Sequence, residues 1–151
     1  MAASTGTYRA WGPYARDILK GSIAVETSGR FKAALTTSSF SPNLDIDQYL
    51  SNISGELYGG LWPSGGVALS SVAVSLDTAG DRVSITHSNI VVDETTLVSP
   101  GVSAIVIYDD LSGVSAATKR LAFYASITPA IITAVQPISI SSPNGIVRSS
   151  Y

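Results

Sequence analysis

Val102-Ser103-Ala104-Ile105-Val106-Ile107-Tyr108 is the stretch of the sequence that decides the predicted fold. Successive side chains of a strand point to opposite faces of a sheet, and from Ala104 onward both sets of alternate residues are apolar. A short apolar run of this kind is typical of a strand that is covered on both faces. We therefore expect residues 102–108 to form a central strand, with other strands arranged around it.

Turn signals bound this stretch on both sides and predict strands that return alongside it. Ser99-Pro100-Gly101 precedes it, and Asp109-Asp110-Leu111-Ser112-Gly113 follows it. Residues 120–127 then place Leu121, Phe123 and Ile127 on one face, which predicts the returning strand. Beyond it we expect two short strands and a turn, at residues 131–135, 138–140 and 143–145.

The chain before residue 99 also has the pattern of strands joined by turns. In residues 30–36, Phe31, Ala33 and Leu35 share a face, which predicts one strand. Alternation changes phase within residues 67–76, and a bulge near Ser70-Ser71 would explain the change. A turn at residues 77–81 predicts a hairpin with residues 83–87. Shorter strands are expected at residues 22–26, 90–92 and 95–98.

One short amphipathic helix is predicted near the N-terminus. Over residues 11–20, Trp11, Tyr14, Ile18 and Leu19 recur at helical spacings, and Gly21 suits the end of the helix. We expect its aromatic residues to cover the sheet, because so short a helix depends on tertiary packing. Residues 37–43 are predicted to be a loop, and residues 45–50 one helical turn capped by Asn43 or Asp45.

A glycine-rich stretch separates the front of the chain from the later strands. It is Ser54-Gly55-Glu56-Leu57-Tyr58-Gly59-Gly60-Leu61-Trp62-Pro63-Ser64-Gly65-Gly66-Val67, and it fits neither a helix nor a plain strand. Tyr58 and Trp62 could stack on a sugar ring, or could fill the open end of the sheet structure. The second interpretation is favoured, with Trp62 as the filling side chain.

About nine strands, turns at short intervals and a single helix predict a mainly β fold. We expect an antiparallel β-sandwich or jelly-roll-like barrel with one short N-terminal helix. The chain of 151 residues is long enough for one domain. Its predicted parts are an N-terminal arm, the short helix, the sandwich strands and a C-terminal tail, at residues 1–10, 11–20, 22–140 and 141–151.

The composition excludes several classes of partner. Charged residues make up 13% of the chain, with a net charge of −2, so the basic face needed to bind nucleic acid is not expected. No apolar run approaches the length of a membrane span. There is no cysteine, and hence no disulfide. A surface with so few charges is easily desolvated against another protein, which favours assembly.

No residue pattern indicates an enzyme. The single histidine, His87, falls in phase with apolar residues of its predicted strand, and no Gly-x-Ser-x-Gly motif is present. The acidic pairs lie in predicted turns, where capping explains them. Asp45, Asp47, Asp109 and Asp110 could offer oxygen ligands to calcium, but they do not form the calcium-loop pattern. We expect no catalytic residues, no cofactor and no metal.

Several segments together resemble a family of small virion structural proteins of tailed bacteriophages. The likeness covers residues 14–127. Its most specific parts are the run from Leu35-Thr36 to Pro42, the pair Gly65-Gly66, and Tyr108-Asp109-Asp110. The segments at residues 14–20, 47–51 and 104–110 follow in the order found in the family. The chain departs from the family at Leu61-Trp62, where Gly-Tyr is usual, and at Ser51-Asn52, where Ser-Asp is usual.

The resemblance implies a structural role in the virion, after synthesis in the host cytoplasm. The leading expectation is a capsid decoration (cement) protein that binds the major capsid protein or other virion proteins. We expect it to form a homo-oligomer, with a trimer favoured. A tail, collar or head-to-tail component is one alternative, and a carbohydrate-binding module is another. Six aromatic residues are the candidate interface: Tyr8, Trp11, Tyr14, Tyr58, Trp62 and Tyr151.

Overall fold

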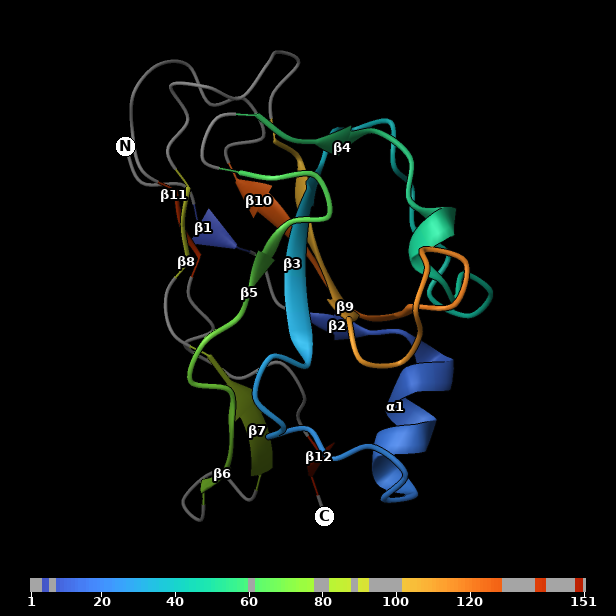
Figure 1. Cartoon of the computed structure of the whole chain (residues 1–151). Coiled ribbons are helices and arrows are strands. Elements are labelled where there is room, and N and C mark those ends of the chain that lie inside the picture. Colours follow the sequence, from blue (N-terminus) through green and yellow to red (C-terminus); the bar gives the residue numbers. More distant parts are fainter. Residues whose placement is uncertain are drawn as a thin grey trace.

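The computed structural model describes residues 4–5, 8–59, 62–77, 82–87, 90–92, 102–128, 138–140 and 149–150. In this part of the chain the strands β1 to β12 accompany a single α-helix, α1, and a single 3-10 turn, η1 (Figure 1). Every strand pairing between the described strands is antiparallel. The expected mainly β, antiparallel fold class is therefore confirmed.

The largest sheet has seven strands, built around β9, β3 and β10. Its main path runs β1-β10-β9-β3-β4, while β2 also pairs with β10 and β5 with β3. The three long strands lie side by side at the centre of Figure 1. The strands are β1 (Ser4–Thr5), β2 (Arg9–Ala10), β3 (Phe31–Thr36), β4 (Glu56–Leu57), β5 (Val67–Ala68), β9 (Ala104–Asp109) and β10 (Arg120–Thr128).

The central position predicted for residues 102–108 is confirmed. Strand β9 pairs with β3 on one side and with β10 on the other, and every residue from Ala104 to Asp109 is buried. The register of β9 with β10 shifts between Leu121 and Phe123, which marks a bulge in β10. A strand enclosed in this way carries apolar side chains on both faces, as its sequence indicated.

Helix α1 (Gly12–Leu19) packs against the end of the main sheet through Tyr14. The Tyr14 ring meets the rings of Phe31 and Phe123 edge-on, at centroid distances of 6.3 and 6.0 Å. Burial of one such aromatic ring contributes about 2 kcal/mol. Gly21, with φ of 72°, ends the helix, and its N–H donates to the Ile18 carbonyl at 2.9 Å. The predicted helix and its role as cover for the sheet are confirmed.

Two smaller sheets contain the remaining described strands. In one, β6 (Ala73–Asp77) and β7 (Arg82–Thr86) form the predicted hairpin, and β12 (Ser149–Ser150) pairs with β7. In the other, β8 (Ile90–Val92) pairs with β11 (Ile138–Ile140), which confirms the two short strands expected there. His87, which follows β7, meets the Tyr8 hydroxyl at 3.4 Å.

The glycine-rich stretch forms a loop that leaves one edge of the main sheet after β4 and returns to the same edge at β5. Strand β4, before it, pairs with the end of β3, and β5, after it, pairs with the beginning of β3. Two hydrogen bonds fix its return: the Gly65 N–H donates to Glu56 Oε1 at 2.6 Å, and the Tyr108 hydroxyl donates to the Gly65 carbonyl at 2.6 Å. Trp62 is 2% exposed, which confirms it as the filling side chain.

Three sequence expectations are corrected. Residues 22–26 form no strand, and Val25 is buried within a loop instead. Residues 67–76 are not one bulged strand, because β5 and β6 belong to different sheets and Ser71 between them has φ of 51°. The helical turn expected at residues 45–50 is divided between a turn at residues 44–46 and η1 (Leu50–Asn52).

Other expectations fall wholly or mostly outside the described residues. These are the strands at residues 95–98 and 131–135, the turns at 99–101 and 143–145, most of the turn at 77–81, and most of the C-terminal tail. The N-terminal arm expected at residues 1–10 is corrected where it is described, because residues 4–5 and 9–10 form β1 and β2 and pair with β10 of the main sheet.

Gly66 is expected to be the glycine of this loop least tolerant of substitution. A Cβ atom added there would lie 1.9 Å from the Ala33 carbonyl oxygen, and φ is 77°. We predict that Gly66→Ala lowers the free energy of unfolding by about 3 kcal/mol, since both a backbone clash and a left-handed conformation are imposed. Urea denaturation followed by circular dichroism measures this change.

Gly21→Ala is the matched control for that measurement. Gly21 has φ of 72°, but no atom lies within 4 Å of its added Cβ. Gly21→Ala should therefore lower the free energy of unfolding by only about 1 kcal/mol, which is the cost of placing alanine in a left-handed backbone conformation. Equal losses in the two variants would show that the close approach of Gly66 to β3 does not exist.

Candidate functional site

Four of the six candidate interface aromatics are buried within the chain. Trp11, Tyr14, Trp62 and Tyr8 are 0%, 1%, 2% and 6% exposed. They cannot provide surface contacts, because the hydrophobic interior of the chain itself already covers them. This corrects the candidate interface for these residues, and it also removes the sugar-stacking pair, since Trp62 is one of its two rings.

The other two candidates have different outcomes. Tyr58 is 57% exposed and is the one member of the set that the structure places at the surface. Tyr151 lies outside the described residues.

A buried polar cluster surrounds Asp109 at the end of β9. Asp109 is 1% exposed, and its Oδ2 accepts hydrogen bonds from the Tyr14 hydroxyl at 2.7 Å and from Arg30 Nη1 at 2.6 Å. Its Oδ1 accepts from the Leu111 N–H at 3.0 Å. Both carboxylate oxygens are therefore occupied. A buried carboxylate needs such partners, because its desolvation would otherwise cost several kcal/mol.

Two further charged groups extend this cluster to the surface of α1. The Arg120 guanidinium lies 5.3 Å from the centroid of the Tyr14 ring and also donates to Asp17 Oδ2 at 2.7 Å. Burial, followed by the hydrogen bond to Asp109, raises the pKa of Tyr14 far above the neutral range. Tyr14 therefore stays protonated, and the cluster anchors α1 to the sheet.

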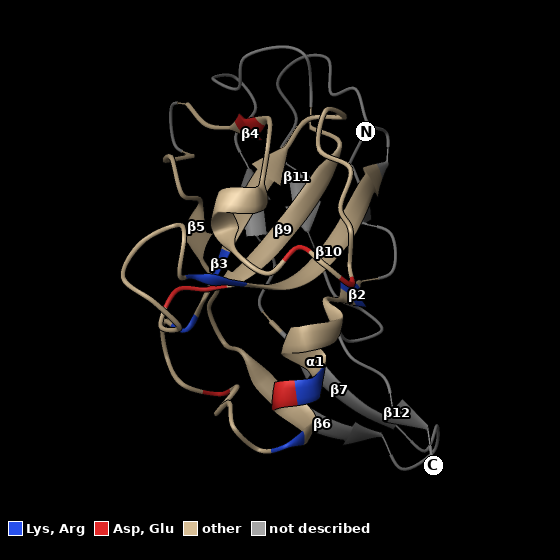
Figure 2. Ribbon diagram, turned by 90° about the vertical axis from the view of Figure 1, so that its right-hand side faces the viewer, with Lys and Arg blue, Asp and Glu red and all other residues tan. Residues whose placement is uncertain are grey.

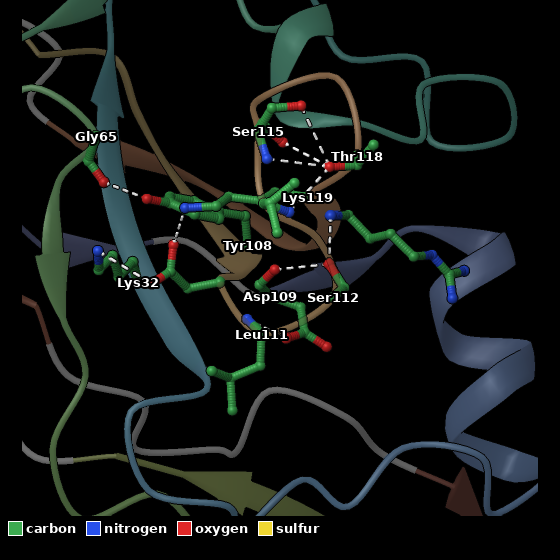
Figure 3. Close-up of polar contacts among 12 residues, drawn as sticks. Lys32, Gly65, Tyr108, Asp109, Leu111, Ser112, Ser115, Thr118 and Lys119 are labelled. Carbon is green, nitrogen blue, oxygen red and sulfur yellow. Dashed lines mark hydrogen bonds and ion pairs between the residues drawn. The ribbon is translucent and has the colours of Figure 1, made fainter.

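A second group of charges lies beside the glycine-rich loop. Lys32 and Lys119 both form ion pairs with Asp110, and Figure 3 shows the two lysine side chains approaching from opposite sides. Burial opposes ionisation of Asp110, but the hydrogen bonds from Lys119 and Lys32 outweigh it and lower the pKa of this carboxyl. Nearby, burial raises the pKa of Tyr108 to about 12, with Asp110 adding to the effect.

Acidic side chains of the described residues do not gather into a metal site. Among them, no three His, Cys, Asp or Glu side chains lie close enough together to hold a metal ion. Of the four possible calcium ligands, Asp109 and Asp110 are ion-paired, and Asp47 accepts a hydrogen bond from the Asn43 N–H. No helix in the described ranges is long and apolar enough to cross a membrane.

Two loops form an uncharged surface, which we call the neutral loop surface. It consists of residues 48–55 and 111–118, and neither segment contains Asp, Glu, Lys or Arg. The segments are joined by backbone hydrogen bonds: the Ser51 N–H donates to the Ala116 carbonyl at 2.9 Å, and the Leu50 N–H donates to the Lys119 carbonyl at 2.8 Å. Figure 2 shows the molecule from this side: the ribbon of η1 is tan, whereas the ribbon of α1 carries blue and red bands where its charged residues lie.

Side chains within each loop fix its shape. Asn52 Oδ1 accepts from the N–H groups of Gln48 and Tyr49, at 3.3 and 2.9 Å. Thr118 Oγ1 accepts from the N–H groups of Val114 and Ser115, both at 3.1 Å (Figure 3 shows Thr118 beside Ser115). Such side chain to backbone bonds hold a loop in one conformation, which lowers the entropy lost on binding.

Apolar side chains project from this fixed framework. Val114 is 97% exposed, Leu111 is 53% exposed and Tyr49 is 39% exposed. Together they make the neutral loop surface the candidate interaction site. The sequence analysis did not single it out, although the uncharged run from Leu111 to Thr118, with Val114 in its middle, was a usable signal.

Comparison with known proteins finds no significant match to a protein-family model, to a curated protein or to a solved structure.

The hydroxyl of Tyr14 is expected to contribute measurably to stability. Tyr14→Phe keeps the buried ring but removes one of the hydrogen bonds to Asp109, so the free energy of unfolding should fall by about 1 to 2 kcal/mol. Tyr58→Phe is the matched control, because Tyr58 is exposed and its hydroxyl has no partner among the described residues. Thermal unfolding of both variants tests this, and equal stabilities would contradict it.

Asp110 is expected to make stability depend on acid pH. Its pKa is lower in the folded protein than the value of about 3.9 in an unfolded chain, so its contribution is present above about pH 4 and is lost as the pH falls below that. We predict that Asp110→Asn reduces the difference in unfolding free energy between pH 7 and pH 3 by roughly 0.5 to 1 kcal/mol. An unchanged difference would show that the two lysines do not stabilise this carboxylate.

Proposed function

We propose that this protein is a structural virion protein of a tailed bacteriophage, and specifically a capsid decoration protein. The observation that carries the proposal is the neutral loop surface, where apolar side chains project from hydrogen-bonded loops that contain no charged residue. The charges that flank the second loop, Asp110 and Lys119, are paired with each other. The resemblance described from the sequence supplies the class of partner, namely the major capsid protein. The mainly β fold is compatible with this role but does not select it.

The proposed mechanism is the burial of the neutral loop surface against the assembled shell. Desolvation of this surface costs little, because no side chain of residues 48–55 or 111–118 is charged. Burial of Val114 and Leu111 then supplies a hydrophobic gain of about 1.5 to 3 kcal/mol for each side chain. Many such copies, each binding assembled coat subunits better than dissociated ones, stabilise the shell by mass action.

Charged substitutions in the loops test this mechanism. Leu111→Asp and Val114→Asp are each predicted to weaken binding to shells that lack the protein by about tenfold or more, because a carboxylate must then be desolvated. Co-sedimentation of purified protein with such shells measures the binding. Both side chains are exposed, so the variants should fold normally.

Leu19→Asp is the matched control, because it places the same charged residue at an exposed apolar position outside the two loops. Leu19 is 78% exposed and lies at the end of α1. This variant should bind shells as the unchanged protein does. Loss of binding in all three variants, or in none, would contradict the assignment of the neutral loop surface.

Copy number separates the two virion roles. A decoration protein is expected on the order of hundreds of copies per particle, arranged by the symmetry of the shell and preferably as trimers. Quantitative mass spectrometry of purified virions gives this number. About a dozen copies would instead support a tail, collar or head-to-tail component.

A further inference from the structure

A polar pocket of about 480 Å³ lies between β2, β10 and the segment at residues 41–45. Its lining includes Arg9, Ser41, Asn43, Asp45 and Tyr124. Ligand sites commonly have volumes of about 300 to 1,000 Å³, so the space suits one or two small rings. None of the interactions proposed for the shell uses this pocket.

The two charged groups of the pocket belong to residues that are exposed at the surface, where a ligand can reach them. Neither the Arg9 guanidinium nor the Asp45 carboxylate has a hydrogen-bonding or ion-pair partner among the described residues. They also do not pair with each other, although both line the same space. The pocket thus presents strong donors and strong acceptors at separate positions.

Local hydrogen bonds fix the wall that carries Asp45. Asn43 Oδ1 accepts from the N–H groups of Asp45 and Ile46, at 3.1 and 3.2 Å. Asp47 Oδ2 accepts from the Asn43 N–H at 2.7 Å. Because the side-chain oxygen of Asn43 already accepts two hydrogen bonds, its NH₂ group is the part of this side chain that remains to bind a ligand.

Tyr124 supplies an ordered aromatic side chain beside Arg9. The two residues are direct cross-strand partners in the register of β2 with β10, which places their side chains on the same face. The Tyr124 ring is held by Trp11 and Phe40, at centroid distances of 6.1 and 6.4 Å. Since Trp11 is fully buried, Tyr124 rests on the fixed core of the protein.

We propose that this pocket binds a neutral sugar unit. Each sugar hydroxyl both donates and accepts, which matches a site that combines Arg9 and Asn43 as donors with Asp45 as acceptor. A small anion would be repelled by Asp45, and a small cation by Arg9. The site differs from the sugar-stacking pair considered from sequence, because Trp62 is buried in the core and Tyr58 does not line the pocket.

Nuclear magnetic resonance titration of the purified full chain tests the proposal. The probes are D-glucose, D-galactose and N-acetyl-D-glucosamine, each expected to bind with a millimolar dissociation constant if it fits. At least one should shift the amide signals of Arg9, Asn43, Asp45 and Tyr124. Arg9→Ala and Asp45→Ala should each weaken its binding by about tenfold or more.

Arg16→Ala is the matched control, because Arg16 is an exposed arginine on α1 that pairs with Asp17 and does not line the pocket. It should leave sugar binding unchanged. The proposal is overturned if none of the three sugars shifts the pocket signals, or if the shifts occur around Tyr58 instead. Sulfate binding that depends on Arg9, without sugar binding, would also overturn it in favour of an anion site.

The sugar titration and the shell co-sedimentation test different surfaces, so one proposal can fail while the other holds. Arg9→Ala and Asp45→Ala leave the neutral loop surface intact, so both variants should still co-sediment with shells. Conversely, Leu111→Asp and Val114→Asp should still bind the sugar, since neither residue lines the pocket.

Discussion

The buried carboxylate of Asp109 is the constraint on which the arrangement of the other elements depends. It ends the central strand β9, and it binds Tyr14 of α1, Arg30 immediately before β3, and the backbone N–H of Leu111 in the following loop. Three separate segments of the chain, namely α1, the start of β3 and the end of β9 with its following loop, therefore meet at one charge. Because an unpaired buried carboxylate is so unfavourable, each segment can hold its place only while the others hold theirs.

Strand β3 sets the second constraint, because it has partners along both edges. Its inner edge pairs with β9, whereas its outer edge is shared between β4 and β5, with the glycine-rich loop between them. Covering an edge in two short pieces hides backbone groups that would otherwise pair with another chain. Gly66 makes this possible, because any side chain there would collide with the backbone of Ala33.

The sequence predicted the positions of the strands and the helix better than it predicted which side chains lie at the surface. Apolar alternation identified β3, β10 and the β6–β7 hairpin, because these strands are long enough to show a period, and an apolar run on both faces identified β9. It failed at residues 22–26 and 67–76, where tertiary contacts override a short pattern. The sequence predicted Trp62 to fill the sheet structure and the aromatic residues of the helix to cover the sheet, but it also made them candidate interface residues, since a large aromatic residue suits a core and an interface equally well.

These placements change how the low charge content of the chain bears on function. Several of its few charges are used internally or at the edge of the core, in the clusters around Asp109 and Asp110. The large aromatic rings that might have served an interface are likewise used in the core. What projects outward at the neutral loop surface is Val114 and Leu111, together with the partly exposed ring of Tyr49. Such a surface suits binding through shape and repeated copies, because so few exposed apolar side chains give each copy only a modest contact energy.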